Sequence, residues 1–473
     1  MSRKRSQSKA SAAADPDAAR LAALEERIKR EPAAADAYLE IAALLSRRRE
    51  PEMAAQILRT GLEKSPRHMG LLTNLGGLLA TGNRADEGVG YLRQVAEMMP
   101  RSYLALYNLA IGLKSAEQFA EAAEQFRATI QFKPDFAEAH VNLGHVLLEL
   151  GRVAEAAEAY ETALPLRRAP GVFTKSPIKT NEAKLRHDIE QLQYLVRLDL
   201  LGPLHESAIA DYESALADLP PLPAGATTVE LPPRHQEKLR AIYNRLLYRH
   251  GGEPLSSGAV NPALDRETIE RSYADNAPGY AWFDSLLTEE ALQALRDFCL
   301  QSTVWFQCRY GDGYLGAFMD DGFCCPLLLQ VADELRHALP GIFARHTLRR
   351  MWAFKYDSRM SGIPIHADFA AINVNFWVTP DDANRDRDGG GLIVWNKRMP
   401  EDWELWRYKD DIPAIRDFLT TNRARSLAVP HRQNRAVMFN SDLFHETGKL
   451  DFRDGYENRR INITMLFGRR QTD

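Results

Sequence analysis

The chain has 473 residues, of which 45% are hydrophobic and 26% charged, which is enough to bury more than one core. Its net charge of −4 disfavours nucleic acid as a partner, because such binding relies on neutralising phosphates with Lys and Arg. No apolar run is long enough to span a bilayer, and the N-terminus lacks the apolar stretch of a signal peptide. The four cysteines have neither zinc nor disulfide spacing. We therefore expect a cytoplasmic protein without a membrane partner.

Residues 1–15 are the first predicted region. The stretch from Ser2 to Lys9 is polar and basic, which is typical of a disordered tail. An imperfect helix from about Pro16 to Arg30 should follow and cover the start of the next region.

A sequence repeat of 34 residues then begins. Prolines recur at this spacing at Pro32, Pro66, Pro100 and Pro134. An Asn-Leu-small triplet recurs in step, beginning at Asn74, Asn108 and Asn142. Small residues also recur, at Ala42, Gly76, Ala110 and Gly144 and again at Ala54, Gly88, Ala122 and Ala156. The pattern resembles the tetratricopeptide repeat (TPR), which implies four helix pairs over about residues 33–168 and an all-α solenoid over residues 16–168. The first helix of each pair should line its concave face.

The repeated asparagines predict a peptide-binding function. Asn74, Asn108 and Asn142 occupy the repeat position that, in the enzyme that attaches N-acetylglucosamine to proteins, holds the backbone of an extended peptide. An amide both donates and accepts hydrogen bonds, so a row of amides binds a peptide with little regard to its sequence. The alternative interpretation is that asparagine is common at this position because it suits helix packing.

Residues 169–275 match neither the repeat nor a β pattern. Asn181 precedes a helical face formed by Leu185, Ile189 and Leu192. A proline-rich break follows, and then a second charged helix is expected from Pro232 to Arg249. This helical connector either extends the solenoid or fixes the angle between two modules.

Residues 276–470 have the pattern of an all-β core with flanking helices. The clearest strand is 371–378, where apolar and amide residues alternate with a period of two. Thr288 is expected to cap a helix near the start of this region. The other β-rich runs are 351–356, 392–395, 435–439 and 460–467.

His366, Asp368 and His445 form a candidate metal site. If residues 366–368 are extended, the side chains of His366 and Asp368 project to the same side. Two imidazoles and one carboxylate on one face of a metal leave other positions open, which suits Fe(II) that must bind a co-substrate and oxygen. A single histidine in such a context is more often structural, and it is the ordered set that indicates a metal.

With these motifs, residues 280–470 resemble the Fe(II)- and 2-oxoglutarate-dependent dioxygenases, which have a double-stranded β-helix (jelly-roll or cupin-like) core. The resemblance implies that His366, Asp368 and His445 bind iron and that Arg460 binds the far carboxylate of 2-oxoglutarate. A guanidinium suits that role because its planar fork matches a carboxylate. Arg459 is the alternative, although Arg460 shares its strand face with polar Asn462 and Thr464.

The resemblance also implies a hydroxylase that uses dioxygen and 2-oxoglutarate and allows a role for ascorbate. Tyr356, Asn373 and Thr464 are candidates for further contacts to the co-substrate. The predicted substrate is a protein or peptide recruited by the repeats. The alternatives are a small molecule or nucleobase, with the repeats used for assembly, and a catalytically inert scaffold. The insert of residues 396–430 is either a lid or a helical cover for the sheet.

Overall fold

In the computed structural model the chain forms two compact units, Met1–Val146 and Leu147–Asp473. The structure describes residues 16–82, 84–172, 176–202, 204–308, 314–357 and 362–470, so the predicted tail of residues 1–15 lies outside the described residues. No helix within these ranges is long and apolar enough to cross a membrane.

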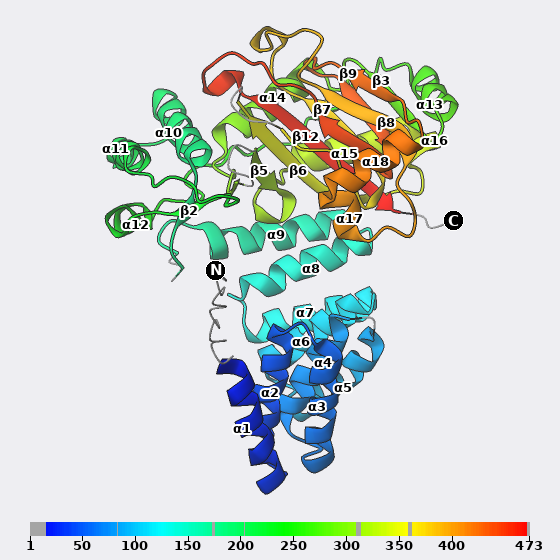
Figure 1. Cartoon of the computed structure of the whole chain (residues 1–473). Coiled ribbons are helices and arrows are strands. Elements are labelled where there is room, and N and C mark those ends of the chain that lie inside the picture. The colour runs from blue at the N-terminus through cyan, green and yellow to red at the C-terminus, as the bar shows by residue number, and fades with distance from the viewer. Residues whose placement is uncertain are drawn as a thin grey trace, which may run out of the picture. The chain divides into compact units, whose positions relative to one another are not determined.

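The N-terminal unit is a stack of antiparallel helices (Figure 1). The predicted helix before the repeats is present as α1, and the expected helix pairs follow it. These helices are α1 (Pro16–Arg30), α2 (Ala35–Arg47), α3 (Pro51–Lys64), α4 (Met69–Ala80), α5 (Ala85–Met98), α6 (Tyr103–Ser115), α7 (Phe119–Phe132) and α8 (Ala137–Glu149).

Small residues allow the paired helices to approach one another, as the sequence predicts. A Cβ atom at Gly88 in α5 would lie 2.5 Å from the carbonyl oxygen of Gly76 in α4. A side chain at either position would therefore force the two helices apart. Ala54 and Ala122, at the equivalent place in other repeats, are fully buried.

The two compact units divide inside the fourth predicted repeat, within α8. Helix α9 (Val153–Arg168) lies in the C-terminal unit. Its last residue, Arg168, donates from Nε to Asp321 Oδ1 over 2.8 Å, and Asp321 ends the short helix η1 (Met319–Asp321). This buried ion pair is one reason why α9 belongs to the C-terminal unit.

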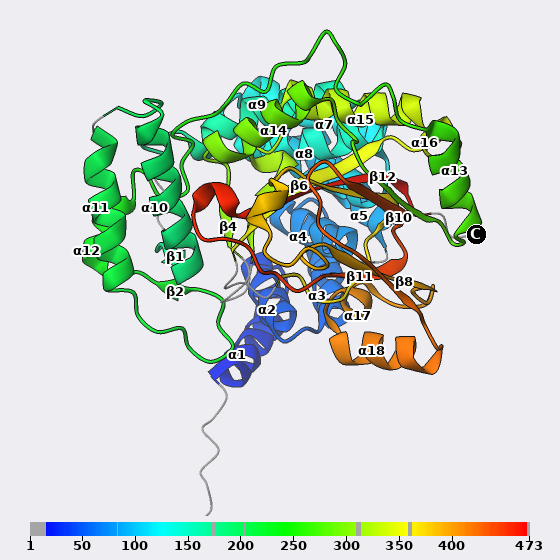
Figure 2. The ribbon, with the colours of Figure 1, turned by 90° about the horizontal axis from the view of Figure 1, so that it is seen from above.

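The connector is also part of the C-terminal unit. Figure 2 shows α10, α11 and α12 side by side. The charged helix expected from Pro232 to Arg249 is limited to α12, because the chain turns after Leu239 and Asn244 adopts a φ of 54° that an α-helix cannot contain. The connector elements are β1 (Lys179–Thr180), α10 (Glu182–Arg197), α11 (Leu204–Ala217), β2 (Val229–Glu230), α12 (Pro233–Leu239) and α13 (Arg266–Asp275).

Two antiparallel sheets form the core of the C-terminal unit. The larger has seven strands in the order β3-β10-β7-β12-β6-β5-β4, and the smaller has three in the order β11-β8-β9. Trp377 and Phe439 of the larger sheet pack with Val394 and Leu443 of the smaller one in a single buried cluster. The strands are β3 (Tyr280–Phe283), β4 (Gln307–Cys308), β5 (Leu315–Phe318), β6 (Leu348–Tyr356), β7 (Ala370–Trp377), β8 (Leu392–Arg398), β9 (Ser426–Val429), β10 (Ala436–Asn440), β11 (Leu443–Thr447) and β12 (Arg460–Arg469).

Helices flank these sheets. The expected cap is confirmed, since Thr288 accepts from the backbone N–H of Ala291 at the start of α14. The predicted insert contains α17 and α18, which lie beside β8 and β11 (Figure 2). The helices are α14 (Glu289–Gln301), α15 (Pro326–Ala338), α16 (Pro340–Phe343), α17 (Leu405–Asp410) and α18 (Ile412–Thr421), with short 3-10 turns at η2 (Asp381–Ala383) and η3 (Tyr456–Asn458).

Candidate functional site

His366, Asp368 and His445 come together although 77 residues of sequence separate Asp368 from His445. One ligand atom from each residue lies within 4.8 Å of the others. His445 is on β11, and His366 forms an isolated antiparallel bridge to it just before β7. The backbone N–H of each histidine donates to the carbonyl of the other, over 3.0 and 2.8 Å. This local pairing fixes the spacing of the two imidazoles.

Both imidazoles are oriented by backbone carbonyls. His366 Nδ1 lies 2.8 Å from the Pro364 carbonyl and His445 Nδ1 lies 3.1 Å from the Leu443 carbonyl. A carbonyl only accepts, so each Nδ1 carries the proton and each Nε2 keeps a lone pair for a ligand. Burial lowers the pKa of His366 and lowers that of His445 to about 3. Both rings are therefore neutral, as metal-binding imidazoles must be.

The carboxylate of Asp368 is buried and held from two sides. Asn373 Nδ2 donates to its Oδ2 over 2.6 Å, and Lys409 Nζ of α17 lies 3.4 Å from its Oδ1. Burial opposes ionisation, but interactions with neighbouring groups, Lys409 among them, outweigh burial and lower the pKa of Asp368. The site therefore presents two neutral nitrogens and one anionic oxygen, a donor set that fits Fe(II).

A chain of amide hydrogen bonds continues from Asp368 across the larger sheet. Asn375 Nδ2 donates to Asn373 Oδ1 over 2.6 Å. Asn375 Oδ1 in turn accepts from Asn462 Nδ2 at 2.9 Å and from the Thr464 hydroxyl at 2.7 Å. Each donor in this chain points toward the carboxylate, so the bonds polarise one another in the same direction. Asn373 therefore orients a ligand residue rather than lining the cavity.

Arg460 is a buried cation at the other end of the same cavity. Its side chain is 1% exposed. The guanidinium donates to the carbonyl oxygens of Gly390 and Gly391 over 2.5 and 3.3 Å, and within the described part of the chain no carboxylate pairs with it. Burial lowers the pKa of Arg460 to about 10, so it stays charged at neutral pH. A buried cation in this state favours an anionic ligand.

Arg459 has a different environment. Its Nε lies 2.8 Å from Glu190 Oε2 and its Nη1 lies 3.2 Å from Asp357 Oδ2. Arg460 lines the cavity together with the candidate metal ligands, and Arg459 does not.

The cavity is narrow, with a volume of about 30 Å³. Of the predicted co-substrate contacts, Tyr356 and Thr464 line it and Asn373 does not. Burial raises the pKa of the Tyr356 phenol, which stays protonated and able to donate. The wall is completed by Trp352, Phe354, Ile363, Asn375, Leu392, Glu446, Thr447 and Asn462, besides His366, Asp368, His445 and Arg460.

The insert covers the back of the segment that carries His366 and Asp368. Ile365 and Ala367, which alternate with His366 and Asp368, are fully buried in a cluster with Tyr408 and Ile415 of the insert. The Ala367 N–H also donates to the Tyr408 carbonyl over 3.1 Å. The described contacts thus favour the interpretation of the insert as a helical cover. Lys409 of the insert makes the polar contact with Asp368.

A second cavity, of about 400 Å³, lies in the N-terminal unit between the first helices of successive repeats. Asn74 and Asn108 line it, but Asn142 does not. The amide of Asn142 is engaged instead by Lys114, whose Nζ donates to Oδ1 over 2.6 Å, and by the Tyr107 hydroxyl, 3.1 Å from Nδ2. The structure therefore brings two of the three predicted asparagines to one groove.

Sequence reasoning missed Lys409 and Asn375. Asn375 could have been found, because it shares a strand face with Asn373. Lys409 has no such signal, since it reaches Asp368 only through the fold of the insert.

Comparison with known proteins identifies the repeats. A sequence model of the tetratricopeptide repeat matches residues 107–172, and no curated protein sequence matches the chain. Among solved structures, MamA from Desulfovibrio magneticus RS-1 is 18% identical, with a TM-score of 0.30 over 32% of this chain and 85% of that chain. YrrB, a TPR protein with an unusual peptide-binding site, is 20% identical, with a TM-score of 0.29 over 31% of this chain and 76% of that chain. Residues 107–172 thus match the tetratricopeptide repeat, and the N-terminal unit is a helical, TPR-like solenoid.

Proposed function

We propose that the C-terminal unit is an Fe(II)- and 2-oxoglutarate-dependent oxygenase of the double-stranded β-helix type that hydroxylates a protein or peptide bound by the repeats. The observation that carries the proposal is the position of Arg460. A buried, charged guanidinium without a carboxylate partner in the described residues lines the same cavity as His366, Asp368 and His445. That combination calls for a ligand with one end on a metal and a carboxylate at the other.

Two imidazoles and one carboxylate would hold the metal. The Nε2 atoms of His366 and His445 and a carboxylate oxygen of Asp368 would be the ligand atoms, because both Nδ1 atoms are engaged by carbonyls. Bound iron would supply the activation of dioxygen coupled to oxidative decarboxylation of the 2-oxo acid. Asn373 would keep Asp368 oriented toward it.

Arg460 would bind and orient the far carboxylate of the co-substrate, with the Tyr356 and Thr464 hydroxyls as further partners. Trp352 and Ile363, which are only partly buried, line the same cavity.

The repeats would supply the substrate. TPR repeats suggest a protein-interaction scaffold, and the groove with Asn74 and Asn108 has polar side chains that can hydrogen-bond a peptide backbone. A nucleic-acid substrate is less well supported, because the arginines that could extend a basic groove are already paired. Arg459 pairs with Glu190, Arg469 with Glu149 and Arg470 with Asp442.

The test is release of succinate from 2-oxoglutarate by the purified full-length protein in the presence of Fe(II) and ascorbate. Wild type should form succinate, and His366→Ala and Arg460→Met should not. Arg469→Met is a matched control, because Arg469 lies on the same strand but is half exposed and pairs with Glu149. A folded wild type that neither binds nor consumes 2-oxoglutarate would leave the repeat scaffold as the function.

A further inference from the structure

Helix α10 contacts α14 and η3, and its Glu190 reaches Arg459, which directly precedes the strand that carries Arg460. Arg460 of β12 pairs with Tyr356 of β6, and the next pair is Ile461 with Lys355. Successive side chains of a strand point to opposite faces. Tyr356 and Arg460 face the cavity, so Lys355 faces away from it, and Arg459 likewise points toward α10.

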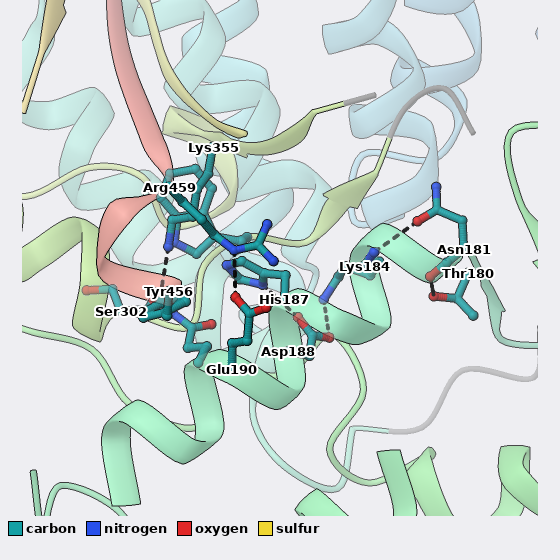
Figure 3. A network of polar contacts seen from close by, with 12 residues as sticks. Thr180, Asn181, Lys184, His187, Asp188, Glu190, Ser302, Lys355, Tyr456 and Arg459 are labelled. Atoms are coloured by element: carbon teal, nitrogen blue, oxygen red, sulfur yellow. Dashed lines mark hydrogen bonds and ion pairs between the residues drawn. The ribbon is translucent and has the colours of Figure 1, made fainter. Parts of the chain in front are cut away.

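Figure 3 shows Glu190 of α10 joined to Arg459, with Lys355 and Tyr456 nearby. Glu190 accepts from Arg459 Nε over 2.8 Å. One residue further along α10, Gln191 Nε2 donates to the carbonyls of Leu300 and Ser302 over 3.2 and 3.0 Å. Leu300 also accepts from the Tyr456 hydroxyl, over 2.7 Å. The helix is therefore attached to α14 and to the segment that enters β12.

A second set of contacts stiffens α10 itself. Lys184 pairs with Asp188 one turn later, and His187 Nδ1 lies 3.0 Å from Asp188 Oδ1 (Figure 3). These side chains are almost completely buried. Buried ion pairs contribute little net stability, but they demand one geometry because any other leaves a charge without a partner.

The backbone at Arg459 is fixed as well. Its carbonyl accepts from the Thr379 hydroxyl over 2.9 Å, and the same hydroxyl accepts from the Ile461 N–H over 2.8 Å. With its side chain held by Glu190 and Asp357 and its carbonyl by Thr379, Arg459 has little freedom. Arg460 follows directly, so its place in the cavity depends on both attachments.

We propose that Glu190 is a positioning residue for the anion-binding end of the cavity. By holding Arg459, it fixes the start of β12 and with it the direction of Arg460. Through Glu190 the connector helix sets the affinity for the co-substrate carboxylate and leaves the metal ligands unaffected. This inference rests on the proposed function, because it assigns Arg460 to a carboxylate ligand.

The test compares full-length variants of α10. Glu190→Gln keeps the shape and an acceptor but removes the charge, and Glu190→Asp restores the charge. Glu182→Gln is the matched control, since Glu182 is an exposed acid of the same helix that pairs with Arg186. Three quantities are measured: the Kd of 2-oxoglutarate by tryptophan fluorescence with Mn(II) in place of iron, the Kd of Mn(II) alone, and amide hydrogen exchange over residues 456–464.

Glu190→Gln should raise the Kd of 2-oxoglutarate about tenfold, the size of effect expected from weakening one charged hydrogen bond. It should speed exchange at residues 459–462 and leave the Kd of Mn(II) unchanged. Glu190→Asp should recover part of the affinity, and Glu182→Gln should match wild type. Should Glu190→Gln not fold, Glu190→Asp against Glu182→Gln gives the same comparison.

An unchanged Kd of 2-oxoglutarate, or an equal loss of both affinities, would overturn the inference. If wild type binds no 2-oxoglutarate at all, the proposed function fails separately. The positioning claim is then decided by exchange alone: faster exchange at residues 459–462 in Glu190→Gln supports it, and unchanged exchange refutes it.

Discussion

Arg459 and Arg460 are adjacent in the chain, yet their side chains lie on opposite faces of the larger sheet. Arg460 lines the cavity that contains His366, Asp368 and His445, whereas Arg459 is neutralised by Glu190 over 2.8 Å. A buried arginine that already has its carboxylate is structural, and one that lacks it is available to a ligand.

The two arginines should therefore respond differently to substitution. Arg460→Met should weaken binding of 2-oxoglutarate by about 2–5 kcal/mol, the usual cost of truncating one member of a buried charged pair, with metal affinity retained. Arg459→Met should instead lower the free energy of unfolding by about 3–5 kcal/mol, because it leaves the carboxylate of Glu190 without its charged partner. Ligand titration and urea denaturation measure the two effects. The reverse pattern would mean that Arg459, and not Arg460, binds the co-substrate.

Removal of one imidazole should abolish metal binding without unfolding the repeats. His366→Ala leaves only Asp368 and His445, too few donors to hold Co(II) or Fe(II) tightly. Absorbance of Co(II) measures the loss, and far-UV circular dichroism checks the helices. His337→Ala, at an exposed histidine of α15, is the control. Undiminished Co(II) affinity in His366→Ala would mean that the metal binds elsewhere.

Asn373 should influence the metal more than the co-substrate. It donates to Asp368 Oδ2 over 2.6 Å and does not line the cavity. Asn373→Ala is expected to lower metal affinity by about 10- to 100-fold, as loss of a hydrogen bond to a ligand commonly does. Calorimetric titration with Mn(II) tests this. An effect on 2-oxoglutarate with unchanged metal affinity would restore the role predicted from the sequence.

The groove of the repeats should depend on two asparagines and not on the third. Asn74→Ala with Asn108→Ala should weaken a bound peptide by about 1–3 kcal/mol, from the loss of two hydrogen bonds. Asn142→Ala is the matched control, because its amide is engaged by Lys114 and Tyr107. Fluorescence anisotropy of a peptide partner gives the comparison, and an equal loss in the control would point to a ladder of all three.

Lys355 predicts a pH dependence of stability. Burial lowers its pKa well below the usual value, so between the folded pKa and about 10.4 the unfolded state binds more protons and wild-type stability rises with pH. Lys355→Met should be more stable than wild type at pH 7, by about 1–4 kcal/mol, and the gap should shrink toward pH 10. Lys355 Nζ donates to the Cys299 carbonyl and to the Tyr456 hydroxyl. Both groups keep another hydrogen bond without it, since Cys299 O accepts from Trp305 Nε1 and the Tyr456 hydroxyl donates to Leu300 O. Thermal unfolding across this pH range measures the difference in stability between Lys355→Met and wild type. A difference that widens with pH would contradict the prediction.

The repeats could be predicted from the sequence because their contacts are local. Gly76 and Gly88 meet in neighbouring helices, and small residues recur at both positions with a spacing of 34 residues that is visible in the sequence. The contact between Arg168 and Asp321 could not be predicted in this way, because the two residues lie far apart in the chain.

The candidate metal site could be predicted for a similar reason, since strand alternation places the side chains of His366 and Asp368 on one side. The contacts that orient these side chains could not be predicted from the sequence. Lys409 reaches Asp368 only through the folded insert, and Glu190 reaches Arg459 only through the docking of α10. Such pairs join elements distant in sequence and carry no periodic signal.

The most direct test of the central claim is anaerobic addition of Fe(II) and 2-oxoglutarate to the full-length protein, followed by visible absorption. A weak charge-transfer band, characteristic of a 2-oxo acid chelated to Fe(II), should appear in wild type and be absent in His366→Ala. In Arg460→Met it should appear only at much higher 2-oxoglutarate. Absence of the band in folded wild-type protein would contradict the account and leave the chain as a TPR scaffold.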